Sequence, residues 1–226
     1  RSLGRIRSLD LGIDPRGVVT ATLVGPSRQA NETDRQFLRD VIARVSALPG
    51  VEAAGLTNRL PLRDGGYQGG VTIDDRPELS GKARPTALYR IATPGYFKAL
   101  GIRLLEGRGV EATDEANSLP VTVVNESFAK QMWPGQSAVG KHVTTAYTGT
   151  SISRTVVGVI REAKLTTVTG PAPAAALAPL EQHSSATAGG VLVVRVAGNP
   201  AGVVPEVRRI VAGLEPQVAV TRVETM

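Results

Sequence analysis

Hydrophobic and polar positions at the start of the chain predict a strand, a helix and a second strand. Residues 16–25 predict a strand, because they hold the mostly β-branched set Val18, Val19, Thr20, Thr22, Leu23 and Val24. Over residues 31–50, apolar side chains recur at the 3.6-residue spacing of one helix face: Phe37, Leu38, Val41, Ile42, Val45 and Leu48. Thr33 followed by Gln36 resembles a capping box at the start of this helix. Pro49 and Gly50 predict its end, and residues 51–61 then form the second strand.

The last 38 residues repeat this plan. Residues 189–198 predict a strand, and residues 199–217 a helix with Asn199 as its N-cap and Pro200 at its first position. The apolar face of this helix holds Val203, Val204, Val207, Ile210, Val211 and Leu214. Pro205 cannot donate a backbone hydrogen bond, so we expect it in the first full turn or at a slight kink. Residues 218–226 predict the closing strand.

Two strand–helix–strand units therefore stand at opposite ends of the chain. Each helix has one apolar face and needs a sheet to cover it. Side by side, the units make a four-stranded sheet with two helices on one face, an α+β layer of the ferredoxin-like kind. The sequence thus predicts a discontinuous subdomain of residues 1–60 and 188–226, with residues 61–187 inserted as a mixed α/β subdomain.

The inserted part has its own pattern of short elements. We expect strands within residues 68–78, 83–93, 102–110, 119–124, 140–147 and 153–163. A short helix begins at Pro94, with Tyr96, Phe97 and Leu100 turned inward, and another begins at Asn125 and ends at Pro134. The Pro/Ala-rich residues 170–190 predict an extended segment with a flexible stretch over 184–190.

Composition narrows the possible classes of protein. The 226 residues are 42% hydrophobic and 20% charged, an ordinary balance for a globular chain. No window approaches 18 uninterrupted apolar residues, so no membrane span is predicted, and the absence of Cys excludes disulfides. The net charge of +6 is dispersed apart from Arg1, Arg5 and Arg7, which we expect near a membrane surface. Because Arg1 is not a natural start, the chain reads as part of a longer protein.

One stretch imitates a nucleotide site. Residues 135–142, GQSAVGKH, match the phosphate-binding loop G-x-x-x-x-G-K-[ST] except at His142, where a metal-binding hydroxyl should stand. That loop needs a strand before it and a helix after it, so that backbone N–H groups meet phosphate. Here the predicted order is inverted, because a helix precedes Gly135 and β-branched residues follow Lys141. We therefore predict a helix stop, a loop and entry to a strand, with no bound cofactor.

Other candidate chemistry is equally weak. Ser137 lies in G-x-S-x-x-G, one residue too long for a nucleophile elbow. His142 and His183 are the only histidines, too few for a metal site without Cys, and each is expected on the surface. Two acidic pairs, Asp74–Asp75 and Asp114–Glu115, are adjacent in sequence and do not converge on one substrate, so we expect them in turns. No catalytic, cofactor-binding or metal-binding residue is therefore predicted.

Nucleic-acid binding is also disfavoured. Such modules combine clustered basic residues with stacking aromatic side chains. The eight aromatic residues here are spread along the chain, and several fall on predicted core faces. The residues by themselves indicate an α+β domain that works by binding or by mechanical coupling.

Three consecutive stretches of the inserted part resemble a known family. TPGYFKALGIRLLEGRGV, PVTVVNESFAKQMWPGQSAVGKHV and TVVGVIREAK are similar, in order and spacing, to the periplasmic core domain of MacB-like ABC-transporter permeases, relatives of the FtsX-like permeases. DPRGVVTATL with LPGVEAAGLTNRLPL, and residues 192–226, look like the segments next to the two transmembrane helices. Within this family, the sequence resembles in particular the large permeases that carry two such domains and are common in acidobacteria and their neighbours. The Pro/Ala-rich run and the small polar loop TAYTGTSIS depart from the family.

The resemblance implies a porter-like layer built from both chain ends with an inserted Sabre subdomain. It further implies an extracytoplasmic position on the bacterial inner membrane and no catalysis in this domain. The implied partners are the flanking transmembrane helices, a cytoplasmic ATPase, a second permease copy or duplicated domain, and in some members a periplasmic adaptor or lipoprotein. ATP-driven movement of the helices would reach this domain through both of its ends and drive export, so the first and last strands should be neighbours.

Two other functions stay open. The first alternative is a stand-alone module that holds a small molecule or peptide between two lobes, and it requires a deep apolar cleft with a few polar groups. The second is a hydrolase, which requires Ser137 or His142 within hydrogen-bond reach of a carboxylate.

Overall fold

A computed structural model describes residues 12–26, 31–61, 67–79, 84–147, 150–161, 172–183 and 189–226. The basic run Arg1, Arg5 and Arg7 and most of the predicted flexible stretch, residues 184–188, lie outside these ranges. The α-helices are α2 (Glu32–Ser46), α3 (Pro94–Leu100), α4 (Glu126–Met132) and α5 (Val204–Leu214). Short 3₁₀ helices are η1 (Pro77–Leu79), η3 (Leu180–Gln182) and η4 (Pro200–Val203). None of the helices in the described ranges is long and apolar enough to cross a membrane.

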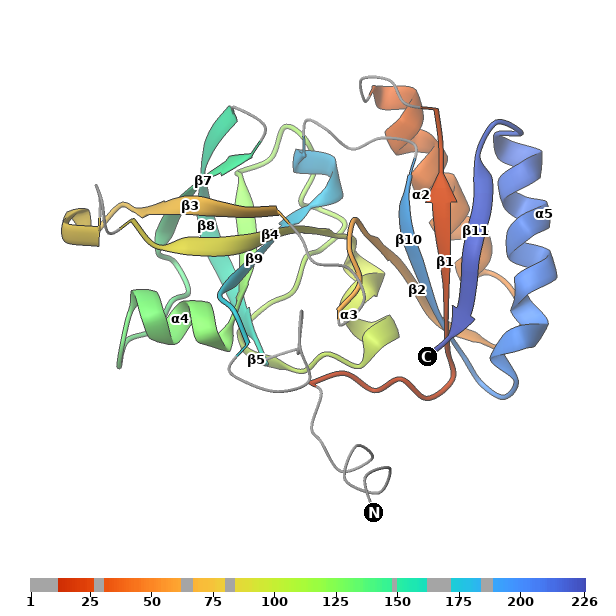
Figure 1. Cartoon of the computed structure of the whole chain (residues 1–226), viewed down its shortest axis with the longest axis horizontal. Coiled ribbons are helices and arrows are strands. Elements are labelled where there is room, and N and C mark those ends of the chain that lie inside the picture. Colours follow the sequence, from red (N-terminus) through yellow and green to blue (C-terminus); the bar gives the residue numbers. More distant parts are fainter. Residues whose placement is uncertain are drawn as a thin grey trace, which may run out of the picture.

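In the described ranges, eleven strands form one continuous sheet in a mixed α+β fold. They are β1 (Val18–Val24), β2 (Val51–Thr57), β3 (Tyr67–Ile73), β4 (Thr86–Ala92), β5 (Leu104–Gly107), β6 (Val121–Asn125), β7 (His142–Tyr147), β8 (Thr150–Ile160), β9 (Ala175–Pro179), β10 (Gly190–Val196) and β11 (Ala219–Thr225). Figure 1 shows two parts, one with the chain's first and last strands and one with the middle strands, and α3 lies between them.

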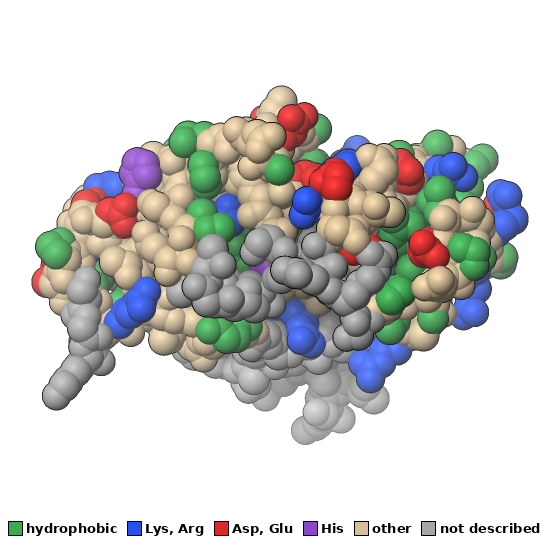
Figure 2. Space-filling view, turned by 90° about the horizontal axis from the view of Figure 1, so that it is seen from above, with side chains coloured by type: hydrophobic (Ala, Val, Ile, Leu, Met, Phe, Trp, Pro, Cys, Tyr) green, Lys and Arg blue, Asp and Glu red, His purple; other side chains and the backbone are tan. Residues whose placement is uncertain are grey.

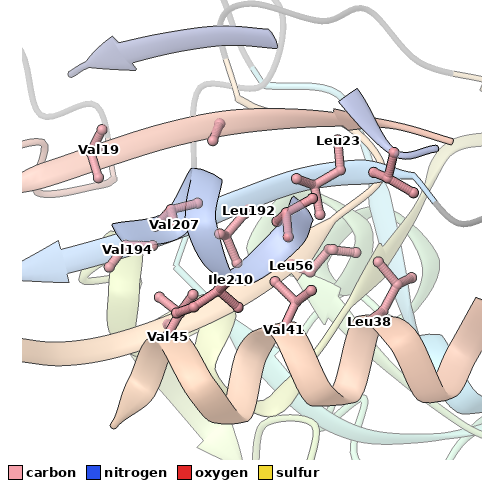
Figure 3. Packing of buried hydrophobic residues seen from close by; sticks show 14 of the residues in the cluster. Val19, Leu23, Leu38, Val41, Val45, Leu56, Leu192, Val194, Val207 and Ile210 are labelled. Atoms are coloured by element: carbon pink, nitrogen blue, oxygen red, sulfur yellow. The ribbon is translucent and has the colours of Figure 1, made fainter. Parts of the chain in front are cut away.

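The first part, here called the terminal sheet, has the antiparallel order β11-β1-β10-β2. The first and last strands, β1 and β11, are therefore neighbours, as predicted. Helices α2 and α5 pack against each other and cover one face of this sheet (Figure 3). On strand β10, Leu192 and Val194 join that core, whereas Val191 and Val193 join a second core built around α3. Both faces of β10 are thus buried, which explains its unbroken apolar run.

The second part, here called the ring, closes on itself. Its pairings run β4-β3-β7-β8-β6-β9 and return from β9 to β4, and β5 adds to the end of β8. Helix α4 packs against it through Phe128 and Met132, and Trp133 follows in the same buried cluster. The hydrophobic periodicity of the sequence predicts most of these strands. It does not predict that they close into a ring, because closure depends on pairing between strands that are far apart along the chain.

Close backbone contact joins the terminal sheet to α3 and so to the ring. Strands β2 and β4 pair only at Thr57 and Ala92. Beside that pair, Gly95 at the start of α3 lies against β2 so tightly that an added Cβ would come within 1.8 Å of the Ala54 carbonyl oxygen. The partner glycine, Gly55, is equally crowded, since its Cβ would lie 2.2 Å from the Tyr96 backbone nitrogen. Only glycines allow this approach.

The helix ends differ in detail from the sequence predictions. The capping box of α2 is formed by Asn31 and Asp34 and not by Thr33 and Gln36: the Asp34 N–H donates to Asn31 Oδ1 at 2.9 Å, and the Asn31 N–H donates to Asp34 Oδ2 at 3.2 Å. Asn199 caps as predicted, but it opens the 3₁₀ turn η4, and α5 begins only at Val204. Pro205 lies in the first turn of α5, where its missing N–H costs nothing, as expected.

Candidate functional site

A cavity of about 830 Å³ lies between the terminal sheet and the ring. Its walls come from α2, the start of β2, the start of α3, the segment 110–117 and the turn at 179–181. This volume falls in the range of small-molecule sites. The inner surface is mainly small and apolar, which leaves the space unfilled; these residues are Ala43, Ala53, Ala54, Ala92, Gly95, Ala112 and Ala116, with Ile42, Val110 and Leu180.

Charged side chains line the same cavity, and most are acidic. Six carboxylates, Glu32, Glu52, Glu111, Asp114, Glu115 and Glu181, face two cationic groups, Arg39 and Lys98. This balance is opposite to that of the whole chain, which has 26 basic and 20 acidic residues. From above, Figure 2 shows basic side chains scattered over this face of the molecule and several acidic side chains close together near its middle.

Arg39 connects two walls of the cavity. Its guanidinium donates to Glu32 on the same helix at 2.5 Å and to Glu181 of η3 at 2.7 Å. Hydrogen bonds from Arg39 and then Arg35 lower the pKa of Glu32. Because Glu181 follows a strand of the ring, this contact ties α2 of the terminal sheet to the ring.

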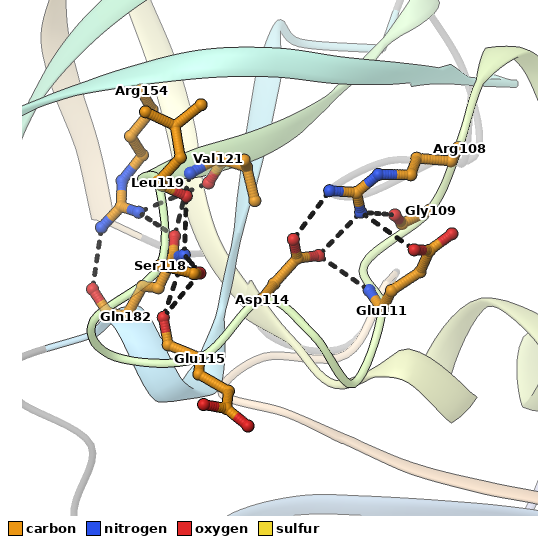
Figure 4. Close-up of polar contacts among 10 residues, drawn as sticks. All are labelled: Arg108, Gly109, Glu111, Asp114, Glu115, Ser118, Leu119, Val121, Arg154 and Gln182. Carbon is orange, nitrogen blue, oxygen red and sulfur yellow. Dashed lines mark hydrogen bonds and ion pairs between the residues drawn. The ribbon is translucent and has the colours of Figure 1, made fainter.

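The segment that forms the outer wall is held by an ion pair at Asp114 (Figure 4). The Asp114 carboxylate is 4% exposed; it accepts from Arg108 at 2.7 and 2.8 Å and from the Glu111 N–H at 2.8 Å. Burial raises the pKa of Asp114, but the hydrogen bonds from Arg108 and Glu111 outweigh it and the pKa is lowered. Bidentate pairing of this kind fixes orientation as well as charge.

Gln182 holds the other end of the same segment (Figure 4). Its amide nitrogen donates to Ser118 Oγ at 3.0 Å and to the Leu119 carbonyl at 3.0 Å, while its Oε1 accepts from the Val121 N–H at 2.9 Å. The buried Arg154 donates to the Gln182 side chain at 3.0 Å and to its carbonyl at 2.9 Å. The cavity wall is therefore fixed at both ends.

The last residue of the chain is bonded to the start of the first strand. The Met226 N–H donates to the Val18 carbonyl at 3.0 Å, beside the β1–β11 pairing. Arg195 of β10 binds both the residues that lead into β1 and helix α3. Its guanidinium donates to the carbonyls of Asp14 at 2.7 Å and Arg16 at 2.8 Å, and to the carbonyl of Ala99 in α3 at 3.1 Å. The Asp14 N–H also donates to the Leu100 carbonyl at 2.8 Å, so the entry segment is bonded directly to α3.

The phosphate-loop letters lie between a helix and a strand, the inverse of the order that a phosphate site needs. Gly135 follows the end of α4, and β7 begins directly after Lys141, which is the predicted helix stop, loop and strand entry. Lys141 Nζ forms an ion pair with Asp75 Oδ2 at 2.5 Å, and Asp75 also accepts from Trp133 Nε1 at 2.9 Å. The hydrogen bond from Lys141 and then that from Trp133 lower the pKa of Asp75.

Ser137 does meet a carboxylate, since its hydroxyl donates to Glu106 in a short hydrogen bond. The geometric requirement of the hydrolase alternative is thus met for Ser137. The other candidate, His142, makes a different contact, since its Nε2 lies 3.3 Å from Thr155 Oγ1. Both the Ser137–Glu106 and His142–Thr155 contacts are exposed hydrogen bonds.

The prediction that both histidines lie on the surface is wrong for His183. This residue is 4% exposed, and its ring lies 5.5 Å from that of Tyr89. Burial, and secondly the charge of Arg154, lower the pKa of His183 to about 4. Sequence reasoning missed it because the Pro/Ala-rich segment around it looks exposed, whereas β9 is paired on both sides within the ring.

Of the two acidic pairs, Asp74–Asp75 lies in a turn as expected, whereas Asp114 and Glu115 lie outside the turns and both line the cavity. Asp74 and Asp75 lie in the turn after β3, and Asp74 accepts from Ser153 Oγ at 3.3 Å. Asp114 is buried on Arg108, whereas Glu115 is exposed. In the described ranges, no group of three or more His, Cys, Asp or Glu side chains could hold a metal ion.

The model of the MacB-like periplasmic core domain matches residues 9–225, nearly the whole chain. The chain belongs to this family. Among proteins with curated descriptions, none matches by sequence.

Solved structures share the fold of this MacB-like domain at low identity. The periplasmic region of MacB from Actinobacillus actinomycetemcomitans has a TM-score of 0.60 and 14% identity, with 96% of this chain and 94% of that chain covered. The extracellular domain of the noncanonic ABC-type transporter YknZ from Gram-positive bacteria has a TM-score of 0.55 and 14% identity, with 90% and 100% covered. A domain of a putative permease protein from Porphyromonas gingivalis has a TM-score of 0.56 and 16% identity, with 94% and 91% covered.

The chain is thus a MacB-like periplasmic domain of an ABC-transporter permease. Domains of this family are periplasmic regions of inner-membrane permeases that associate with an ATPase and with transmembrane parts.

Proposed function

We propose that this domain transmits movement from the membrane-spanning part of its permease to the periplasmic side, without catalysis of its own. The observation that supports this proposal is the hydrogen bond between Met226 and Val18, beside the pairing of the first strand β1 with the last strand β11. Force applied at either end acts on the adjacent strands β1 and β11. It passes through Arg195 to α3, and through the tight Gly55–Gly95 contact to the ring.

The finer architecture is part of the same proposal. The strand order β11-β1-β10-β2 supports a ferredoxin-like, porter-like layer made from residues 1–60 and 188–226. The ring supports an inserted Sabre-like subdomain over residues 61–187. We place the domain on the periplasmic face of the inner membrane, with export of a substrate driven by a cytoplasmic ATPase and with a second permease copy or an adaptor as neighbour. Assignment to the acidobacterial permease type stays a prediction.

A flexible insertion at the chain ends tests force transmission. In the full permease, about ten Gly and Ser residues inserted after Met226 and before Gly12 should abolish export, because such a linker behaves as a random coil and cannot pull. ATP hydrolysis by the cytoplasmic subunit should continue. The matched control carries the same insertion between the exposed residues Gly135 and Gln136 of the ring, away from the chain ends and from the cavity. Export that survives the terminal insertion would refute mechanical coupling through this domain.

A second candidate function is ligand binding, and the cavity between the terminal sheet and the ring favours it. The cavity supplies the cleft that the two-lobe alternative requires. Family membership argues against a stand-alone module, so we place such binding within the permease.

A further inference from the structure

The buried imidazole of His183 lies directly beside the residue that holds one end of the cavity wall. His183 follows Gln182 in the chain, and the Gln182 amide donates to Ser118 Oγ and to the Leu119 carbonyl, both at 3.0 Å (Figure 4). The His183 N–H donates to the Leu180 carbonyl at 3.1 Å, which closes the turn η3. A movement that takes His183 out of its buried site therefore also displaces Gln182 from the wall.

The groups that surround the imidazole disfavour a positive charge on it. The ring of Tyr89 on β4 lies 5.5 Å from the imidazole, and the buried Arg90 follows Tyr89 on the same strand. From β8, the buried Arg154 donates to the Gln182 carbonyl at 2.9 Å, one peptide bond away from His183. A protonated imidazole would thus be shielded from water and close to a fixed guanidinium charge, and both effects favour its expulsion.

The other attachments of the same wall are ion pairs. At its far end, the Asp114 carboxylate is bound by Arg108 at 2.7 Å, and its lowered pKa keeps this pair charged in mildly acidic solution. Beside Gln182, Glu181 is paired with Arg39 at 2.7 Å. Of the groups named here, His183 is the one whose ordinary titration range, near pH 6.5, lies in mildly acidic solution.

We infer that His183 is an acid-sensitive switch that opens the outer wall of the cavity at its Gln182 end. Uptake of one proton drives the imidazole out of its buried site and withdraws Gln182. The wall then loses its hydrogen bonds at residues 118–121, while the Asp114–Arg108 pair keeps the other end attached. This inference concerns the wall itself, so it is independent of force transmission and of ligand binding in the cavity.

The direction of the switch follows from where the proton binds more tightly. With the wall closed, the pKa of His183 is about 4, and with the wall open the imidazole is in water and has its ordinary pKa near 6.5. The open form is therefore favoured as pH falls. Linkage to one proton predicts that the open fraction rises about eightfold between pH 7 and pH 5.5.

Amide hydrogen exchange of the full 226-residue chain, corrected for the intrinsic effect of pH on exchange, tests the switch. Protection of residues 117–121 should fall about eightfold between pH 7 and pH 5.5. The Glu111 N–H, which donates to Asp114 at 2.8 Å, should keep its protection, because it belongs to the end that stays attached. The β10 amides of Leu192 and Val194 should exchange more slowly than the wall at both pH values, because they open only with the core.

Three variants assign the effect to its residues. His183→Asn removes the titrating group, so protection of residues 117–121 should no longer depend on pH, and His183→Gln is measured as well in case the Asn variant does not fold. His142→Asn is the matched control, because it removes the chain's other histidine, which is exposed, and should keep the eightfold change. Gln182→Ala should leave residues 117–121 weakly protected at both pH values.

Several results would overturn the inference. One is equal protection of residues 117–121 at pH 7 and pH 5.5 in the parent chain. Another is an unchanged pH dependence after substitution of His183, or its loss in His142→Asn. Full protection of the wall in Gln182→Ala would show that Gln182 does not hold it. If residues 117–121 exchange as slowly as the β10 amides, the wall opens only when the whole domain unfolds, and the switch is refuted.

Discussion

At the scale of single residues, the most informative side chains are polar groups that the fold has buried. Asp114 keeps its charge because Arg108 and a backbone N–H surround it. His183 is in the opposite situation, since it lies beside Tyr89 and near the positive Arg154, and both burial and that charge favour its neutral form. The first residue stabilises a cavity wall, and the second makes the fold sensitive to acid.

Acidification should therefore destabilise the domain through His183. The folded pKa is about 4 and the unfolded pKa is near 6.5, so the unfolded chain binds the proton more tightly. The contribution is complete above pH 6.5 and is lost as pH falls toward 4, by about 3 kcal/mol. Urea unfolding of the parent chain and of His183→Asn at pH 7, 5.5 and 4 measures it. The difference in free energy of unfolding between the two should shrink at low pH, and a constant difference would contradict the assignment.

At the scale of elements, the stability of the fold depends on elements whose two faces are both buried. Strand β10 sends alternate side chains into the α2–α5 core and into the α3 core. Helix α3 is only seven residues long, too short to be stable alone, so its position comes from packing against β2 and β10. The glycines at 55 and 95 make that packing possible.

Gly95→Ala should destabilise the domain strongly. The added Cβ meets backbone and not a movable side chain, so α3 must shift away from β2, at a cost of at least about 2–3 kcal/mol. Gly213→Ala in α5 is the matched control, because nothing lies within 4 Å of its added Cβ. That control should be neutral or stabilising by up to about 1 kcal/mol. Chemical unfolding measures both, and a Gly95→Ala chain as stable as the parent would refute the close contact.

At the scale of the whole molecule, hydrogen bonds connect the terminal sheet, α3 and the residues that lead into β1. Arg195 is the centre of that arrangement, since one side chain bonds the entry segment and α3 from within the terminal sheet. Its side chain is 14% exposed, so water does not easily replace these bonds. A single residue thereby couples the start of the chain to the helix that leads to the ring.

Arg195→Ala should loosen the entry segment and lower the free energy of unfolding by about 2–4 kcal/mol, because three charge-assisted hydrogen bonds are lost. Arg195→Lys keeps the charge but not the planar donor geometry, so it should recover only part of the loss. The chain has no cysteine, so a spin label on an introduced Arg16→Cys, at an exposed side chain whose backbone carbonyl accepts from Arg195, reports this segment alone. Label mobility should rise in the Ala variant, and an unchanged spectrum would show that Arg195 does not hold the segment.

The functional candidates show where sequence reasoning stopped. The order of elements around the phosphate-loop letters was predicted correctly, because local patterns alone indicate a helix before Gly135 and a strand after Lys141. The cavity could not be predicted, since Glu52, Lys98 and Glu115 are ordinary surface residues in their own segments. Their relation exists only after β2, α3 and the outer wall have come together.

The sequence by itself determined the elements, the strand–helix–strand units at both ends, and the family. These follow from hydrophobic periodicity, capping residues and turn residues, which act over a few positions. Only the tertiary structure decided the closure of the ring, the burial of His183, the glycine contact at α3 and the acidic cavity. Each of these depends on pairs separated by tens of residues, and no local pattern of side chains encodes which distant segment a given face will meet.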